Sequence, residues 1–223
     1  MSGRLIVFEG VEGCGKTTQL QRSHQWLKTL SLPAIVTREP GGTNLGTALR
    51  QLLLNVGKQP IYNSTELLLY AADRAQHVEE VLKPELASGT IVLCDRYVDS
   101  TVAYQGYGRG LSHSLIAQLN SIATGGLESD VTIWLDIDVA ISLARKQHQS
   151  TSDCAERSAG GDRIEQEKIE FHRRVQQGYT ELAQNHQNRI VRVDASRSVA
   201  EVQEQIQQIL LQRFPEIRDK YNS

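Results

Sequence analysis

Short apolar runs rich in β-branched residues alternate along the chain with longer stretches that carry apolar residues at helical spacing. The runs lie at 5–8, 34–36, 91–94, 131–135 and 190–193. The helical stretches lie at 17–30, 65–87, 114–123, 139–146, 164–183 and 199–214. Continuous apolar runs are typical of strands buried on both faces, and their alternation with helices indicates parallel pairing. We therefore predict an α/β fold with a five-stranded parallel sheet flanked by helices on both faces.

Two segments do not follow this alternation. Residues 147–161 are polar and poor in apolar side chains, and they separate two predicted helices. A polar connection of this length inside an α/β domain is more often a lid than a packed element, so we predict a mobile lid at about 145–163. Residues 215–223 are expected to be a frayed end. Because no repeat and no low-complexity linker is present, residues 1–223 are expected to form a single domain.

Composition narrows the possible locations and partners. A length of 223 residues with 39% hydrophobic content suits one domain with a sizeable core. The net charge of −2 gives no general attraction to nucleic acid or to an anionic membrane. No apolar run approaches the ~20 residues that span a bilayer, and the N-terminus lacks a signal-peptide pattern. Cys14, Cys94 and Cys154 match no metal-binding spacing, and such unpaired thiols favour the reducing cytoplasm.

The segment GVEGCGKT, from Gly10 to Thr17, matches the phosphate-binding pattern G-x-x-x-x-G-K-[ST] between a predicted strand and a predicted helix. Glycines in such a loop let backbone N–H groups surround a phosphate chain at the positive end of a helix. Lys16 is expected to reach the outer phosphates, and the Thr17 hydroxyl to coordinate Mg²⁺. The pattern predicts a P-loop NTPase fold that binds a nucleoside triphosphate. The loop positions expected to bind it are Gly10, Val11, Glu12, Gly13, Cys14, Gly15, Lys16, Thr17 and Thr18.

Charged residues follow several of the predicted strands. Ligands of open parallel sheets bind outside the carboxyl ends of the strands, so these residues are candidates for one site. Asp95 directly follows an apolar run, where a carboxylate steadies Mg²⁺ directly or through water; a strand-end cap is the alternative. Arg96 is suited to bidentate phosphate contact. Arg38 and Arg74 add positive charge, unless each is a surface ion-pair partner, as Asp73 beside Arg74 allows.

Four further motifs follow the loop in order: REPGGT at 38–43, YAADR at 70–74, DRYVDSTVAYQG at 95–106 and DRIE at 162–165. With them the chain resembles thymidylate kinase from its first strand to the turn at 194–196, which is nearly the whole chain. The loop alone is shared by very many NTPases, whereas the combination is much more specific. The resemblance implies a P-loop nucleoside monophosphate kinase that converts dTMP to dTDP with ATP and Mg²⁺.

The resemblance also implies roles for individual residues. Glu12 contacts the sugar 3′-hydroxyl of the acceptor, Tyr70 stacks on thymine, and Arg74 binds a thymine carbonyl. Arg96 holds the acceptor phosphate, and Tyr104 fills the space of a 2′-hydroxyl. The other positions expected to bind substrate are Arg38, Glu39, Ser100, Thr101 and Gln105. The turn expected near the adenine of the donor contains Ala195, Ser196 and Arg197. For Tyr70 and Tyr104 a plain core role is the open alternative.

The lid is expected to supply one catalytic charge. Some members of the family carry an arginine in the loop where this chain has Gly13. Those without it resemble the bacterial type, in which lid arginines supply the charge. Arg157 is our first candidate and Arg163 our second, with Arg145 and Lys146 also available.

Transfer to an oxygen that is already anionic needs little general-base help, so positioning and charge neutralisation are expected to dominate catalysis. The residues expected to do this are Lys16, Asp95, Arg96, Arg157 and Arg163. Two alternatives stay open. Another pyrimidine nucleoside monophosphate or deoxynucleoside kinase would have a different base pocket, and a non-kinase P-loop ATPase would hydrolyse nucleotide without an acceptor.

The expected partners are ATP and dTMP, without nucleic acid or membrane. Thymidylate kinases are generally homodimers, so the resemblance favours a homodimer. The apolar stretch at 66–72 is a plausible place for one helix to meet its two-fold mate.

Overall fold

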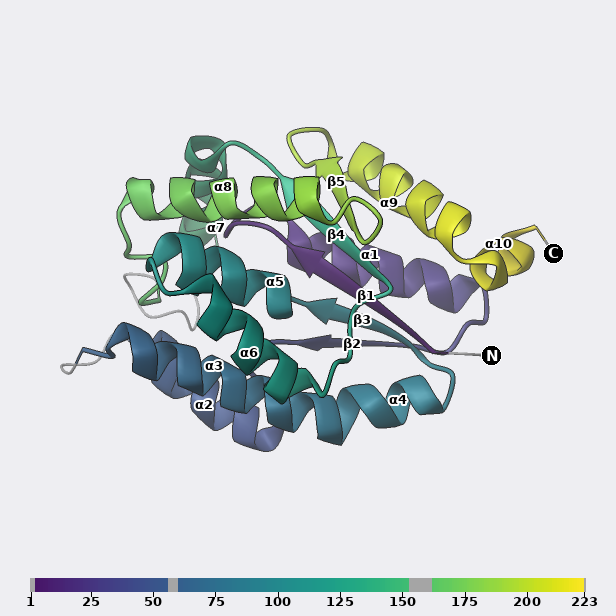
Figure 1. Ribbon diagram of the computed structural model, residues 1–223. Coiled ribbons are helices and arrows are strands. Elements are labelled where there is room, and N and C mark those ends of the chain that lie inside the picture. Colours follow the sequence, from purple (N-terminus) through teal and green to yellow (C-terminus); the bar gives the residue numbers. More distant parts are fainter. Residues whose placement is uncertain (1–2, 56–59, 153–161, 223) are drawn as a thin grey trace.

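The chain forms one parallel sheet in a computed structural model that describes residues 3–55, 60–152 and 162–222. The strand order is β2-β3-β1-β4-β5, and every neighbouring pair is parallel (Figure 1). The strands are β1 (Arg4–Glu9), β2 (Ala34–Arg38), β3 (Ile91–Asp95), β4 (Val131–Asp136) and β5 (Ile190–Asp194). The predicted α/β fold with a five-stranded parallel sheet is therefore confirmed.

The helices cover both faces of this sheet. They are α1 (Lys16–Thr29), α2 (Asn44–Leu54), α3 (Asn63–His77), the π-helix η1 (Val78–Leu82), α4 (Lys83–Ala87), α5 (Val98–Thr101), the π-helix η2 (Val102–Gly108), α6 (His113–Thr124), α7 (Val139–Ser152), α8 (Ile169–Asn185), α9 (Val199–Arg213) and α10 (Pro215–Tyr221). Figure 1 shows α1 and α9 on one side of the sheet and α3, α4 and α6 on the other. Within the described residues, no helix is long and apolar enough to cross a membrane.

The central strand β1 explains why its sequence is a continuous apolar run. Leu5, Ile6, Val7 and Phe8 are all fully buried. Ile6 and Phe8 belong to the large core that includes residues of α1 and α9, whereas Leu5 and Val7 pack with residues of η1. Successive side chains of a strand point to opposite faces, so a strand between two helical layers is apolar at every position.

The helix predicted over 65–87 is interrupted in the structure by η1, between α3 and α4. Pro84 lies near the start of α4. Its ring would clash with the carbonyl of Glu80 in a regular α-helix, and it provides no N–H. The wider π-helical turn over Val78–Leu82 ends two positions before this proline and gives the chain room to continue.

The lid region also differs from its prediction. The helix expected at 139–146 runs on to Ser152, so the first part of the predicted lid is helical. The next helix begins at Ile169 rather than at 164, because Asp162 accepts the N–H groups of Ile164 and Glu165 and holds a turn there. Residues 153–161 of the predicted lid lie outside the described residues.

The expectation of a frayed end at 215–223 is corrected by α10. Pro215 stands at its first turn, a position where proline favours a helix start. Ile217 is fully buried and Phe214 is 4% exposed, so this end of the chain is part of the core.

Candidate active site

The phosphate-binding loop joins β1 to α1 along a backbone path that requires glycine. Gly10, Gly13 and Gly15 have positive φ angles of 141°, 76° and 100°. A Cβ at Gly10 would lie 2.6 Å from the carbonyl oxygen of Leu135, and one at Gly13 would lie 2.5 Å from that of Ser142. Side chains at these positions would push the loop away from its neighbours. Glycine therefore keeps the loop at the N-terminus of α1, where phosphate binds favourably.

Lys16 lies against the inside of this loop. Its Nζ donates to the carbonyl oxygens of Gly10 and Val11, at 3.1 Å each, and the side chain is buried. Val11 and Cys14 are buried in the core, so their expected nucleotide contacts are limited to backbone groups. The Cys14 thiol is a structural group, since burial raises its pKa.

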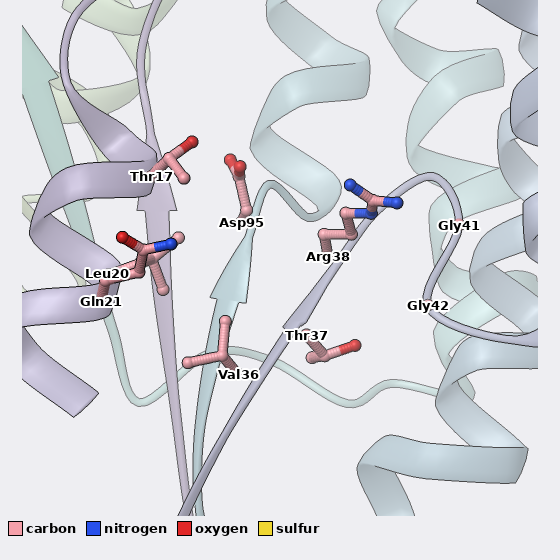
Figure 2. Close-up of a pocket in the computed structure, with 9 residues that line it drawn as sticks. All are labelled: Thr17, Leu20, Gln21, Val36, Thr37, Arg38, Gly41, Gly42 and Asp95. Carbon is pink, nitrogen blue, oxygen red and sulfur yellow. The ribbon is translucent and has the colours of Figure 1, made fainter. Parts of the chain in front are cut away.

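Thr17 and Asp95 both line one cavity of about 340 Å³. In Figure 2, Thr17 at the start of α1 and Asp95 at the end of β3 are neighbours, and Arg38 lies beyond them. The Asp95 Oδ1 atom is buried and takes no hydrogen bond from any described residue. A buried carboxylate oxygen without a donor is costly, and a cation or its hydration shell satisfies it. A hydroxyl and a carboxylate fit Mg²⁺, which keeps several waters and phosphate oxygens as its other ligands.

Arg96 connects the loop with the helix that follows β3. Its backbone has φ of 70°, unusual for a residue with a side chain. Its Nη2 donates to Glu12 Oε1 at 2.6 Å and to the Tyr104 hydroxyl at 3.0 Å, and Nη1 donates to the Gly10 carbonyl at 3.1 Å. The guanidinium therefore holds together the loop and the expected acceptor side of the site.

Glu9 and Tyr179 support Arg96 from below, and sequence analysis missed both. Glu9 is fully buried, and its carboxylate accepts hydrogen bonds from the hydroxyls of Ser100 at 2.6 Å and Tyr179 at 2.7 Å. Burial raises the pKa of Glu9, although Arg96 acts in the opposite direction. An acidic residue at the end of an apolar strand, directly before the loop, was a signal for Glu9. Nothing in the sequence distinguishes Tyr179 from an ordinary core aromatic of α8.

Arg74 is buried rather than a surface residue, with 2% of its side chain exposed. Its Nε donates to Glu39 Oε2 at 2.8 Å. Its Nη1 donates to Thr101 Oγ1 and Asn120 Oδ1, and its Nη2 to the Tyr97 carbonyl. A guanidinium has five N–H groups, and four of those of Arg74 are used: the one on Nε, both on Nη1 and one on Nη2. The second N–H of Nη2 has no partner among the described residues.

Asp73 is therefore not the partner of Arg74. Its Oδ1 accepts the N–H of Gly41 at 2.9 Å instead. Glu39 also accepts from His77 Nδ1 at 2.9 Å, and His77 Nε2 lies 2.7 Å from the Thr37 hydroxyl. Glu39, expected among the substrate-binding residues, is thus a buried partner of Arg74 and His77.

Arg38 has a second arginine beside it that sequence analysis missed. Arg38 is exposed and lines the cavity of Figure 2. Arg50 of α2 donates to the Pro40 carbonyl at 2.9 Å. Burial, with the repulsion of Arg38, lowers the pKa of Arg50. Two neighbouring guanidinium groups favour the binding of an anion between them. Arg50 was overlooked because α2 was not predicted.

The aromatic candidates lie on two facing helices. Tyr70 is half-buried on α3, one turn before Arg74. Tyr104 on η2 is 6% exposed, with the Arg96 guanidinium 4.8 Å above its ring. It also packs on Phe171, so it has both a core contact and a contact with Arg96. The other expected positions on α5 and η2 are all buried: Ser100, Thr101 and Gln105.

The turn after β5 lies close to α7. Ala195 is buried, and Ser196 donates its N–H and hydroxyl to Asp194, at 3.0 and 2.6 Å. Arg197 is exposed and lies 3.4 Å from Asp194. Arg145 donates to the carbonyls of Ala195 and Ser196, so it braces this turn.

Of the two main lid candidates, Arg163 lies within the described residues and Arg157 does not. Arg163 Nε donates to the Leu53 carbonyl at 2.9 Å, and its Nη2 donates to the buried Glu66 carboxylate. Arg157 and the side chain of Lys146 lie outside the described residues. The structure thus brings together the loop, Thr17, Asp95, Arg96, Glu12 and Tyr104. Arg163 is not part of this group, because it binds the Glu66 carboxylate instead.

Comparisons with known proteins give one answer. A family model described as thymidylate kinase matches residues 8–206. Thymidylate kinase of Nostoc punctiforme is 63% identical over 94% of this chain and 96% of its own length. Thymidylate kinase of Geobacter sulfurreducens is 45% identical over 96% and 99%. The crystal structure of thymidylate kinase from Ehrlichia chaffeensis is similar with a TM-score of 0.75 at 30% identity, covering 94% of this chain and all of that one. The chain therefore belongs to the thymidylate kinase family.

Proposed function

We propose that this chain phosphorylates dTMP to dTDP, with ATP as donor and Mg²⁺ as the metal. Family membership makes it a kinase that uses ATP and dTMP. One observation supports the details most strongly: Arg96 contacts both the Gly10 carbonyl of the phosphate-binding loop and the Tyr104 hydroxyl on the acceptor side. A donor site and an acceptor site that share one guanidinium suit transfer between two phosphates.

The donor side neutralises charge. Backbone N–H groups of the loop and the Lys16 amine bind the phosphate chain of ATP. Thr17 and Asp95 would hold Mg²⁺, whose positive charge would neutralise negative charge on the transferring phosphoryl group. The Ala195–Arg197 turn, braced by Arg145, receives the adenine.

The acceptor side selects and orients dTMP. Arg96, Arg38 and the adjacent Arg50 bind its phosphate, whose anionic oxygen attacks without a general base. Glu12 binds the 3′-hydroxyl. Tyr104, held by Arg96 and Phe171, leaves no room for a 2′-hydroxyl.

The base lies against α3. Tyr70 stacks on the thymine ring, and the one N–H of Arg74 that has no described partner binds a thymine carbonyl. Gln105 and Thr101 complete this pocket from the opposite helix. Because Arg74 is immobilised by Glu39, little entropy is lost when it binds the base.

An arginine of the lid is proposed to stabilise the transition state. Arg157 remains the first candidate. Arg163 would have to leave the buried Glu66 carboxylate to reach a phosphate. Such a move would leave the buried Glu66 carboxylate with Arg109 as its remaining arginine partner. Because removing a partner from a buried charge is costly, Arg163 is the less favoured candidate for the catalytic arginine.

A homodimer in the cytoplasm is the proposed state. Large apolar side chains are exposed on α2, α3 and α6, of which α3 packs against both others (Figure 1). They are Leu45, Leu52, Leu68, Leu115 and Ile122. Exposed apolar side chains on adjacent helices support an interface. The free, buried thiols of Cys14 and Cys94 suit a reducing compartment.

An ADP-release assay with dTMP, dUMP, dCMP and UMP tests the function. We expect turnover to depend on the acceptor and to be fastest with dTMP. ADP release that needs no acceptor would instead support an ATPase. Lys16→Ala should abolish turnover, since the amine neutralises transferring phosphate. Lys28→Ala, on the exposed side of α1, is the matched control and should keep wild-type turnover. Wild-type turnover by Lys16→Ala would exclude the proposed donor site.

A further inference from the structure

Two helical faces with matching residue spacing border the proposed base pocket. Glu66, Tyr70 and Arg74 follow one another at every fourth position of α3. Thr101 and Gln105 have the same spacing on α5 and η2, with Arg109 four positions further on. Residues four apart lie on one side of a helix. Hydrogen bonds link both ends of these faces: Arg74 donates to Thr101, and Gln105 and Arg109 donate to Glu66.

The amide of Gln105 has a defined polarity in this arrangement. Its Nε2 donates to Glu66 Oε1 at 2.7 Å. An ionised carboxylate only accepts hydrogen bonds, so it accepts the NH₂ group and repels the carbonyl end of the amide. No described residue donates to Gln105 Oε1. The Gln105 amide is therefore oriented with its acceptor atom, Oε1, on the side that faces away from Glu66.

Glu66 stays ionised in spite of complete burial. Burial opposes ionisation, but hydrogen bonds from Gln105 and Arg109 and the charges of Arg109 and Arg163 lower its pKa below the usual value. Arg109 Nη1 also donates to Glu167. Two arginines and two glutamates make a neutral cluster, which is the condition under which buried charge is tolerated.

Pyrimidine bases differ at the C4 and N3 positions, which are the positions that the free N–H of Arg74 and the carbonyl oxygen of Gln105 would contact. Thymine and uracil present a carbonyl acceptor at C4 and an N–H donor at N3, whereas cytosine presents an amino donor and a bare acceptor. The free N–H of Arg74 matches the carbonyl, and a carbonyl oxygen of Gln105 matches the N3 donor. In cytosine, the amino group at C4 would face the Arg74 N–H, so that two donors would meet. Its N3 acceptor would face the carbonyl oxygen of Gln105, so that two acceptors would meet.

We propose that Glu66 is a specificity-determining positioning residue, which fixes the Gln105 amide so that its oxygen selects bases with a donor at N3. The proposal rests on the proposed function, since it assumes that dTMP binds beside Tyr70. Glu66 itself does not touch the substrate. It acts through Gln105, and Arg109 and Arg163 keep its carboxylate in place.

The test is the Glu66→Gln variant, assayed for kcat/KM with dTMP, dUMP and dCMP. Without an obligatory acceptor at position 66, the Gln105 amide can turn over and offer its NH₂ to the base. We expect the preference for dTMP over dCMP to fall by about tenfold, the value of one mismatched hydrogen bond. Arg74 still disfavours the amino group, so part of the preference remains. The preference for dTMP over dUMP should stay unchanged, because these bases share the same edge.

Glu167→Gln is the matched control. It removes one negative charge from the same cluster but does not contact Gln105, so both preferences should remain at wild-type values. If Glu66→Gln does not fold, the variant that also carries Arg109→Gln restores the charge balance and should show the same selective loss. Glu66→Asp, which keeps an acceptor-only carboxylate, should keep the preference against dCMP even if kcat/KM falls.

Three results would overturn the proposal: an unchanged dTMP/dCMP ratio in folded Glu66→Gln, an equal fall of both ratios, or loss of the preference against dCMP in Glu66→Asp. A wild-type protein that does not phosphorylate dTMP would instead overturn the proposed function, so the two failures are distinguishable.

Discussion

Asp73 shows how strongly a single buried carboxyl group depends on its surroundings. It is 1% exposed, and its Oδ2 takes no hydrogen bond from a described residue. Burial raises its pKa from 3.8 to about 6; Glu39 acts in the same direction, while the Gly41 N–H, His77 and Arg74 act against it. Asp73 is therefore a destabilising group at neutral pH that nonetheless anchors the loop after β2.

We predict that Asp73→Asn stabilises the protein in a pH-dependent way. The folded state keeps the Asp73 proton to higher pH than the unfolded state does, so Asp73 costs stability as the pH rises from about 4 to 6, and the full cost remains above 6. Asparagine keeps an acceptor for Gly41 without the charge. The gain in unfolding free energy should be about 1–3 kcal/mol near pH 7.5 and should shrink toward pH 4. Urea unfolding of both proteins across this range measures it, and a gain independent of pH would refute the assignment.

At the scale of elements, α10 is a short helix that behaves as part of the core. Ile217 is fully buried, and Glu216 accepts a hydrogen bond from Arg4 Nε at 2.6 Å, so α10 is attached to the start of β1. A helix of this length is not stable alone, and its packing must hold it.

Ile217→Ala should therefore lower the free energy of unfolding by about 2–4 kcal/mol, because it removes buried methyl groups and leaves a cavity. Turnover at low temperature should not change, since α10 lies away from the proposed site. Chemical denaturation together with the ADP-release assay measures both effects. Asp219→Ala, at a side chain that is 74% exposed, is the control and should change stability little. Equal stabilities of Ile217→Ala and the wild type would mean that the end of the chain is frayed after all.

At the scale of the whole molecule, the exposed apolar side chains of α2, α3 and α6 carry a prediction about assembly. Leu68 on the middle helix, α3, is 56% exposed. Leu68→Arg places a charge where two copies would meet, and burying an unpaired charge is costly. We expect the wild type to sediment as a dimer and Leu68→Arg as a monomer in analytical ultracentrifugation. Val199→Arg, at a 46% exposed position on α9, is the control and should remain dimeric. A monomeric wild type would exclude the proposed interface.

The predicted sheet and the phosphate-binding loop depend on local patterns, which is why sequence alone could define them. Strands buried on both faces must be apolar at consecutive positions, and a loop that closes around phosphate must have glycine where φ is positive. Two helices had local start signals that were overlooked. Thr43 caps α2 by accepting the N–H of Gly46, and Pro215 begins α10.

The partners of the buried charges were decided only by the tertiary structure. Arg74 pairs with Glu39 and not with the adjacent Asp73, and Arg163 contacts Glu66 from 97 positions away. A buried charge takes the partner that the packing of helices brings within reach, and hydrophobic periodicity contains no information about that choice. Sequence determined which residue types gather at the carboxyl ends of the strands. The fold determined which of them hold one another, because those contacts join segments that are far apart in the chain.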